Sequence, residues 1–351
     1  MKKKTLLIPC AGRSSRYPGT RPKWMLTTPE GQLMIERAAQ SLSEGSVERV
    51  VIGTLTEFEE LYGVRDIIRR TCLRDAEIVL LDQLTSGPAE TVRLMIEKAG
   101  VTGPICLKDS DSFFGLTELP EGSFVTVLDL RQNPQITSVG AKSFAVLNEQ
   151  GLISDIVEKS VVSNFISVGL YGFSDASVFV DVYDNLKTRF SGGEFFISHV
   201  ISAALNGGEL FHPVMAQGFQ DVGTLNDWRD YCSDFSTLVL DLDGVVFVNH
   251  SKYFKPLWEE DDQPLQDNVN ALLRLQAKGA QLMFMTARPE KYRAKTEASL
   301  RKLGLNIHAL VMGCLHGRRY LVNDYAASNP YPSAVAVNLE RNTGKLSQFV
   351  G

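Results

Sequence analysis

The stretch Leu6-Leu7-Ile8-Pro9-Cys10-Ala11-Gly12-Arg13-Ser14-Ser15-Arg16 decides how the first part of this chain folds. Its apolar beginning predicts a buried strand, and the small residues that follow let backbone N–H groups approach an anion closely. Arg13, Arg16 and Lys23 lie in or just after the same loop, and cations crowded together without an anion repel one another. The stretch therefore predicts a strand that leads into a phosphate-binding loop.

Apolar runs and amphipathic helical patterns alternate beyond this loop, which is typical of a parallel α/β sheet. Strands are predicted over residues 5–9, 50–54, 78–81 and 104–108, and helices over residues 34–43, 58–70 and 90–99. A turn is predicted at Ser86-Gly87-Pro88. Residues 123–173 read mostly as short strands separated by Asn and Gly. The first part of the chain is therefore expected to be one mixed α/β domain.

The alternating pattern starts again near residue 236, where a strand is predicted to run into two carboxylates. The elements predicted after it are a helix over 268–278, a strand over 281–286, a helix over 291–303 and a strand over 320–323. With 351 residues, the chain exceeds what one hydrophobic core usually serves. We therefore expect two α/β domains, residues 1–233 and residues 236–351.

The composition, 44% hydrophobic and 22% charged, is that of an ordinary globular protein. A net charge of −5 argues against a broad nucleic-acid-binding surface. The five scattered cysteines form no C-x-x-C pair, which favours a reducing cytosol over a disulfide framework or a zinc site. The first apolar run stops at Pro9, too early for membrane insertion. We expect a cytoplasmic protein, and the sequence leaves open whether it is a homo-oligomer.

Six segments, in the same order along the chain, resemble the sugar-phosphate nucleotidyltransferase family. Ser14 stands where that family has its second loop glycine. The segments are Pro9-Cys10-Ala11-Gly12-Arg13-Ser14-Ser15-Arg16 with Pro22-Lys23; Gln83 with Ser86-Gly87-Pro88-Ala89; Lys108-Asp109-Ser110-Asp111-Ser112-Phe113-Phe114; Glu158-Lys159 with Ser163 and Val168-Gly169-Leu170-Tyr171; Gly193-Glu194-Phe195-Phe196; and Gln220-Asp221-Val222-Gly223-Thr224. The resemblance implies a GT-A-like, Rossmann-like domain with a mixed sheet.

The resemblance also implies an activity: transfer of a nucleoside monophosphate from a nucleoside triphosphate to a sugar or polyol phosphate, with release of pyrophosphate. Arg16 and Lys23 would be the catalytic cations that hold the triphosphate. Asp111 and Asp221 would bind Mg²⁺, which prefers carboxylate and phosphate oxygens. They lie far apart in the sequence, so their convergence is a prediction, whereas Asp109 is expected to be a solvated or supporting residue at the strand end.

The same resemblance implies two sets of substrate-binding residues. Lys159 and Glu194 would bind the acceptor, with Lys159 on its phosphate. The base is not fixed by these residues, and CTP is weakly preferred over UTP, dTTP and GTP. The residues implied to bind the nucleotide are Ala11, Gly12, Arg13, Ser14, Gln83, Ser86 and Gly87.

The segment Leu240-Asp241-Leu242-Asp243-Gly244-Val245 resembles the first motif of the haloacid dehalogenase-like (HAD) phosphatases. This implies Asp241 as the nucleophile and Asp243 as the general acid or base, with both also binding Mg²⁺. Thr286, in a segment like the second motif, would bind phosphate, and Asp324 would be a further Mg²⁺ ligand. The short interval between Asp243 and Thr286 predicts a domain without a large cap.

The third HAD motif, a lysine, has no counterpart in its expected segment. Arg318 is the candidate that would replace it on the substrate phosphate, and Lys295 is the other, although a solvated helix position suits Lys295 better. The segment Trp258-Glu259-Glu260-Asp261-Asp262 is expected to be an exposed acidic loop.

Together these resemblances favour a bifunctional enzyme that makes a nucleotide-linked sugar or polyol and hydrolyses a related phosphate monoester. A precursor of a surface polysaccharide, such as a capsule, is the expected product. The main alternative is an active nucleotidyltransferase with a non-catalytic HAD-like module for assembly or ligand sensing. A regulator that only binds nucleotide is a further alternative, disfavoured because Arg16, Lys23, Asp111 and Asp221 are all present.

Overall fold

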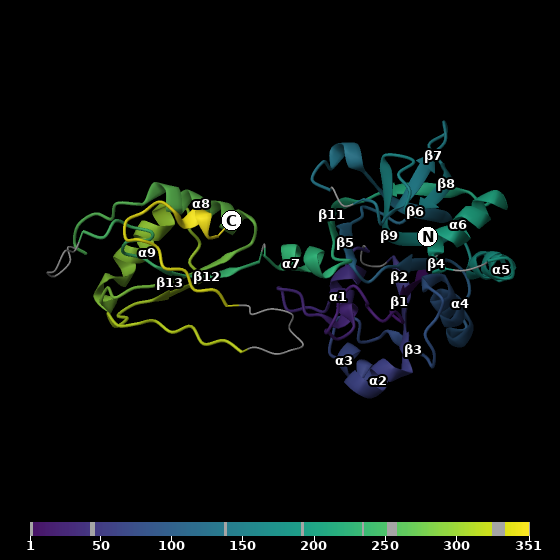
Figure 1. Ribbon diagram of the computed structural model, residues 1–351, viewed down its shortest axis with the longest axis horizontal. Coiled ribbons are helices and arrows are strands. Elements are labelled where there is room, and N and C mark those ends of the chain that lie inside the picture. The colour runs from purple at the N-terminus through teal and green to yellow at the C-terminus, as the bar shows by residue number, and fades with distance from the viewer. Residues whose placement is uncertain are drawn as a thin grey trace. The chain divides into compact units, whose positions relative to one another are not determined.

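A computed structural model describes residues 3–42, 46–136, 139–190, 193–233, 235–250, 258–324 and 334–350. The chain divides into two compact units, Met1–Trp228 and Arg229–Gly351 (Figure 1). This division lies a few residues before the boundary expected between residues 233 and 236. No helix in the described part of the chain is long and apolar enough to cross a bilayer.

A nine-stranded mixed sheet forms the centre of the first unit, in the order β3-β2-β1-β4-β9-β6-β10-β8-β7. The strands β3, β2, β1 and β4 run parallel, and β9 joins β4 in the antiparallel sense. The strand bounds are β1 Lys4–Pro9, β2 Val47–Leu55, β3 Glu77–Leu81, β4 Ile105–Lys108, β6 Ser123–Asp129, β7 Ser143–Leu147, β8 Ile153–Glu158, β9 Phe165–Phe173 and β10 Phe211–Met215. The four parallel strands predicted for this unit are confirmed.

A separate two-stranded antiparallel sheet joins β5 (Ser112–Gly115) to β11 (Gln217–Asp221). In it Asp221 pairs with Ser112, the residue after Asp111. Backbone pairing thus brings together two segments that lie about a hundred residues apart in the chain, and it does so next to the end of β4.

Helices cover the main sheet at several places. The helix α4 (Pro88–Ala99) packs on β1, β2 and β3, while α6 (Ile197–Asn206) packs on β8 (Figure 1). The helix α5 (Ala176–Lys187) contacts α4, α6 and β9. The unit also contains α1 (Met34–Ala39), two short helices between residues 56 and 68, and the 3₁₀ turns Lys23–Met25 and Leu130–Gln132, with α7 (Leu225–Ser233) at the division between the units.

The single helix predicted over residues 58–70 is wrong in one respect. Two short helices, α2 (Thr56–Tyr62) and α3 (Val64–Ile68), replace it. Gly63 between them has φ +64° and donates its N–H to the Glu59 carbonyl. A left-handed glycine of this kind ends a helix, because the backbone turns away from the axis there.

Apolar side chains of the sheet and its helices form one continuous core in the first unit. Leu7, Ile8, Val51, Ile105 and Leu107, on the central parallel strands, are fully buried. A parallel strand covered on both faces reads as an unbroken apolar run, which is why the sequence identified these strands. The buried strands hold their carboxyl ends in fixed positions.

The second unit contains a small parallel sheet in the order β12-β13-β14, with bounds Thr237–Asp241, Gln281–Met285 and Ala309–Val311. The helices α8 (Gln266–Ala277) and α9 (Arg293–Lys302) lie in the same unit, with the 3₁₀ turns Glu290–Tyr292 and Leu346–Gln348. Leu240, Leu272 and Phe284 belong to its separate core.

The strand predicted over residues 320–323 is wrong. These residues form no strand, and Tyr320, Leu321 and Val322 are 79%, 63% and 90% exposed. The third place in the sheet is taken by Ala309–Val311, which pairs with β13. A short apolar run becomes a strand only where a neighbour offers hydrogen bonds and burial, and the sequence does not show which run has that neighbour.

Candidate functional site

A cavity of about 830 Å³ opens where β1 and β4 end. After β1 the chain adds β2 and β3 on one side of it, and then returns to add β4 on the other side. The direction in which strands are added to the sheet therefore reverses between β1 and β4. Open α/β sheets bind ligands at such points, outside the carboxyl ends of the strands. The loop after β1 lines the cavity from Cys10 to Arg16, so the predicted phosphate-binding residues Ala11, Gly12, Arg13 and Ser14 all face the same space as Lys23.

Ser14, the departure from the family's glycine, adopts φ +53°, a left-handed conformation that glycine adopts readily. Its Oγ accepts a hydrogen bond from the Lys23 backbone N–H at 3.0 Å. The Tyr17 N–H donates to the Ser14 carbonyl at 2.7 Å. The hydroxyl thus ties the loop to Lys23, which a glycine would not do.

Replacing Ser14 with alanine should lower the free energy of unfolding by about 1–2 kcal/mol, because alanine keeps the left-handed strain and leaves the Lys23 N–H without its acceptor. Ser14→Gly should be less destabilising, since glycine relieves the strain. Urea unfolding of both variants measures the difference. Equal stability of the two variants would show that the left-handed strain contributes nothing, and wild-type stability in Ser14→Ala would show the same of the hydroxyl.

Asp111 and Asp221 meet at one corner of the cavity, as the sequence predicts. A Cβ built on Gly223 would lie 3.1 Å from Asp221 Oδ1, 3.3 Å from Asp111 Oδ2 and 3.4 Å from an Arg16 guanidinium nitrogen. The Val222 N–H also donates to the Asp111 carbonyl at 3.0 Å. Two carboxylates and a guanidinium therefore surround a single point.

Both carboxylates are paired with lysines. Lys23 Nζ contacts Asp111 Oδ2, which is also 3.6 Å from an Arg16 guanidinium nitrogen, and Lys142 Nζ contacts Asp221 Oδ2. Burial acts to raise the pKa of Asp111, but Lys23 and Arg16 outweigh it and hold that pKa below its usual range. Asp111 is therefore available as an anion for a cation.

The donor set fits Mg²⁺ in part. Asp111 and Asp221 supply two carboxylate oxygens near one point, and Mg²⁺ commonly takes one or two carboxylates and completes its shell with phosphates and water. Among the described residues no group of three His, Cys, Asp or Glu side chains is placed to hold a metal ion. Such an ion would therefore need phosphate oxygens as further ligands.

Lys108 is a buried cation to which the sequence analysis gave no role. Its ammonium donates to the carbonyls of Asp109 and Ser112, both at 2.8 Å, and to Ser112 Oγ at 2.7 Å. The side chain is fully buried, and this burial lowers the pKa of Lys108 to about 8. Lys108 ties down the turn from Asp109 to Ser112, and so positions Asp111.

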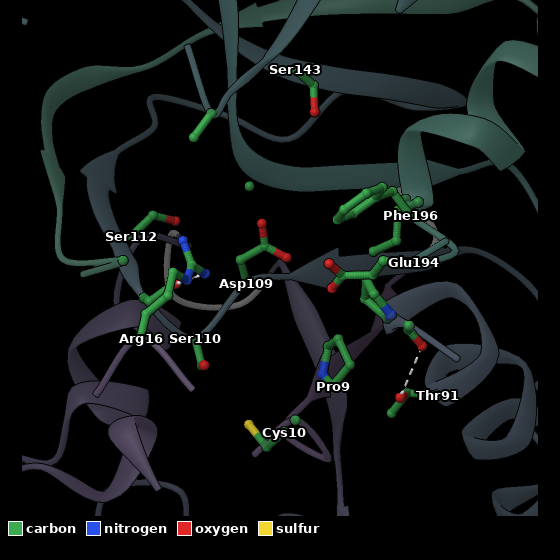
Figure 2. A pocket seen from close by; sticks show the side chains of 18 of the residues that line it. Pro9, Cys10, Arg16, Thr91, Asp109, Ser110, Ser112, Ser143, Glu194 and Phe196 are labelled. Atoms are coloured by element: carbon green, nitrogen blue, oxygen red, sulfur yellow. Dashed lines mark hydrogen bonds and ion pairs between the residues drawn. The ribbon is translucent and has the colours of Figure 1, made fainter. Parts of the chain in front are cut away.

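Asp109 directly follows the end of β4, as expected, and it lines the cavity. Figure 2 shows its carboxylate turned toward the open space. Burial, and then the neighbouring Asp111 carboxylate, raise the pKa of Asp109 to about 6.

A second wall of the cavity is the turn before α4. The Phe195 N–H donates to the Ser86 carbonyl at 2.9 Å, and the Ala89 N–H donates to the Phe195 carbonyl at 3.1 Å. A Cβ on Gly87 would lie 2.5 Å from the Phe195 carbonyl oxygen, so only glycine allows this approach. Ser86 and Gly87 line the cavity, whereas Gln83, predicted to bind the base, is exposed and lies outside its lining.

The opposite end of the cavity contains the predicted acceptor residues. Lys159 Nζ lies 4.4 Å from the centre of the Phe196 ring, and Glu194 also lines the space (Figure 2). Glu158, which the sequence analysis quoted without a role, accepts hydrogen bonds from the hydroxyls of Ser143 at 2.5 Å and Ser198 at 2.7 Å. The structure thus places Lys159 and Glu194 in the same cavity as Arg16 and Lys23.

Lys142 was missed entirely by the sequence analysis. It precedes β7, far along the chain from the loop after β1, and no motif marks it. A basic residue on an irregular segment gives no periodic signal, so only the structure brings it to Asp221.

The second unit places three of its predicted residues close together. Asp241 ends β12 and pairs in register with Met285, the residue before Thr286. Thr286 Oγ1 lies 3.4 Å from Asp243 Oδ2. The cation beside Asp241 is Arg319, at 2.8 Å, instead of the predicted Arg318, which is exposed.

Arg288 is the residue that the sequence analysis of this unit overlooked. Only 2% of its side chain is exposed, and its guanidinium pairs with Asp243 at 2.7 Å and with Asp262 at 2.8 Å. The segment 258–262 is therefore not simply an exposed acidic loop, because the Asp262 side chain is only 7% exposed. Its backbone is also held by Lys295, which donates to the carbonyls of Trp258 and Glu260 and is not a purely solvated residue.

Asp324 lies in an exposed, irregular segment, because the strand predicted to carry it is absent. In the described part of the unit, no cluster of three potential ligands includes it.

No family model and no curated protein matches the sequence of this chain. Solved structures do match its fold. A nucleoside-diphosphate-sugar pyrophosphorylase from Vibrio cholerae RC9 is 22% identical, with a TM-score of 0.56 over 65% of this chain and 99% of that one. An inositol-1-phosphate CTP transferase from T. maritima is 18% identical, with a TM-score of 0.52 over 65% of this chain and 94% of the other. A UDP-glucose pyrophosphorylase solved with UDP-glucose is 16% identical, with a TM-score of 0.51 over 66% of this chain and 97% of the other. The amino-terminal 65% of this chain therefore has the fold of the solved nucleotidyltransferases.

Proposed function

We propose that the first unit transfers a nucleoside monophosphate from a nucleoside triphosphate to a phosphorylated acceptor. The convergence of Arg16, Lys23, Asp111 and Asp221 on one corner of a large cavity carries this proposal. A phosphate oxygen of the acceptor forms a bond to the α-phosphorus, and the bond from that phosphorus to the bridging oxygen breaks. The bridging oxygen keeps the electron pair and leaves as part of pyrophosphate.

All the reactants are anions, so the chain's main task is to neutralise charge and to align the reacting atoms. Arg16 and Lys23 hold the triphosphate, and the loop Ala11–Ser14 offers backbone N–H groups to it. Asp111 and Asp221 would hold Mg²⁺, which supplies charge neutralisation between the phosphates when bound. Lys159 binds the acceptor phosphate.

The acceptor proposed is a sugar or polyol phosphate, and CTP is the proposed donor. One solved structure of this fold is named a CTP transferase for inositol 1-phosphate, and another a UDP-glucose pyrophosphorylase, so both the base and the acceptor vary on this scaffold. The proposed product would serve as an activated building block for a surface polysaccharide.

The test is pyrophosphate release with Mg²⁺, each of the four triphosphates separately, and a pool of sugar, aminosugar and polyol phosphates. Asp111→Ala is measured in parallel as the blank. Release with one triphosphate that disappears in the variant supports the proposal and identifies the base. If folded protein, shown by a cooperative melting transition, releases no pyrophosphate with any combination, the result contradicts the proposal.

The proposed function of the second unit is Mg²⁺-dependent hydrolysis of a phosphate monoester. The approach of Asp243 to Thr286 and the pairing of Asp241 with Arg319 support it. Asp241 attacks phosphorus, the bond from phosphorus to the ester oxygen breaks, and water then cleaves the aspartyl phosphate. Arg319 takes the place of the missing lysine, with Asp243 as the acid that protonates the leaving oxygen.

A non-catalytic module is the alternative, and the ion pair between Asp243 and the buried Arg288 favours it.

If the unit is a phosphatase, the full-length chain should hydrolyse p-nitrophenyl phosphate with Mg²⁺, and Asp241→Asn should reduce the rate at least about a hundredfold, because it removes the nucleophile. Asp261→Asn, a change at an exposed carboxylate, is the matched control. Equal rates in wild type and Asp241→Asn would favour the non-catalytic module.

A further inference from the structure

Asp109 is a carboxylate that the proposed reaction does not use. Its backbone N–H donates to the Gly169 carbonyl at 2.8 Å, and its side chain lies against the same residue. A Cβ on Gly169 would come within 2.6 Å of Asp109 Oδ2, and Gly169 has φ +84°. The backbone of β9 thus leaves room for this carboxylate, which a side chain at position 169 would displace.

The Asp109 carboxylate accepts no hydrogen bond and forms no ion pair within the described ranges of the chain. Each cation nearby is directed elsewhere. Lys108 donates to backbone and hydroxyl oxygens, Lys23 pairs with Asp111, and Lys142 pairs with Asp221. An anion in the wall of a cavity without a partner is unfavourable unless a ligand supplies one.

Glu194, at the end of the cavity that contains Lys159, is a second carboxylate without a partner among the described residues. It accepts no hydrogen bond among the residues whose positions are described, and Figure 2 shows it and Asp109 turned toward the same open space. Glu158 differs, because the hydroxyls of Ser143 and Ser198 donate to it. The acceptor end therefore offers two anions that await donors, in the same cavity as the phosphate-binding cation Lys159.

A hydroxyl and an ammonium both donate hydrogen bonds to a carboxylate, but only the ammonium also neutralises its charge. Both bonds are strengthened by the carboxylate charge, and the ammonium adds the attraction between opposite charges. With Lys23 and Lys142 directed to the phosphates of the substrates, Lys108 is the remaining lysine whose charge acts on Asp109, and its hydrogen bonds go to other oxygens.

We propose that the acceptor phosphate of this enzyme carries a protonated primary amine, and that Asp109, assisted by Glu194, binds that amine. The proposal rests on the acceptor site proposed above and restricts it to a substrate class, the phosphates of amino sugars or of amino alcohols. Lys159 binds the phosphate of such an acceptor and Asp109 its ammonium group, so both charges of the acceptor are matched.

The experiment compares acceptors that differ only in an amine. Binding to the full-length protein is measured by calorimetry for glucosamine 1-phosphate against glucose 1-phosphate, and for phosphoethanolamine against ethylene glycol phosphate. We expect the amine of at least one pair to bind at least about tenfold more tightly, which corresponds to 1.4 kcal/mol. The pair that shows the difference distinguishes an amino sugar from an amino alcohol.

Asp109→Asn keeps the shape of the side chain and removes its charge, and should abolish the preference for the amine while leaving the binding of its hydroxyl counterpart within about threefold. Glu194→Gln, at an exposed position that does not threaten folding, should reduce the same preference. Asp75→Asn, at a side chain that is 97% exposed, is the matched control and should leave it unchanged. An equal or tighter affinity for the hydroxyl compounds, an unchanged preference in Asp109→Asn, or no binding of any of the four compounds would overturn the proposal.

Pyrophosphate release separates this inference from the proposed function. Selective binding of an amine without release under any triphosphate contradicts nucleotidyl transfer and leaves amine recognition standing. Release with an acceptor phosphate that lacks an amine, together with no preference for the amine, contradicts amine recognition and leaves nucleotidyl transfer standing.

Discussion

Alanine at position 111 should reduce pyrophosphate release by a factor on the order of 10³, the effect expected when a preorganised charge is removed from the reacting centre. Asp111 contacts Lys23, lies 3.6 Å from Arg16 and meets Asp221 near Gly223. Its loss removes one of two carboxylates that would hold Mg²⁺ and frees two cations from their fixed positions. Steady-state release under saturating triphosphate measures the change, which should fall mainly on kcat.

Asp75→Ala is the matched control for this variant, because that carboxylate is almost fully exposed. It should retain wild-type activity. A rate in Asp111→Ala within tenfold of wild type, in protein of unchanged melting temperature, would show that Asp111 is not part of the reacting centre.

Replacing Lys108 with methionine should destabilise the first unit by about 3 kcal/mol, since a buried acceptor left without its donor costs about 1–3 kcal/mol. Methionine has nearly the same length but donates nothing, and the carbonyls of Asp109 and Ser112 lose the ammonium that binds them. Activity should fall as well, because the turn that carries Asp111 loses its anchor. Urea unfolding and pyrophosphate release measure the two effects.

The stability difference should also depend on pH. Burial lowers the pKa of Lys108 from 10.5 to about 8, so between these values the unfolded chain binds more protons than the folded one. Stability contributed at this site therefore rises with pH across that window, and the advantage of wild type over Lys108→Met should grow from pH 8 toward pH 10. Lys98→Met, which loses one exposed hydrogen bond to the Leu80 carbonyl, should show no such growth.

The sequence by itself determined the parallel half of the first sheet and the loop after β1. Buried parallel strands read as unbroken apolar runs, and Leu6–Pro9 and Ile105–Lys108 carry that signal in a few adjacent residues. The small residues and cations of the loop are likewise local. Arg16 and Lys23 lie in or just after that loop, whereas Asp111, Lys159, Glu194 and Asp221 were predicted from the resemblance of their segments to a known family. All six residues line one cavity.

Only the tertiary structure decided which charges face one another. The pairing of β11 with β5 places Asp221 beside Ser112, and Lys142 forms an ion pair with Asp221. Asp109 faces the cavity because Gly169 leaves room for it, and Arg288 joins Asp243 to Asp262 in the second unit. It also decided that residues 309–311, and not 320–323, complete the small sheet. Periodicity reports whether a segment has a buried face, whereas the partner of a side chain depends on how distant segments pack, and no local pattern encodes that.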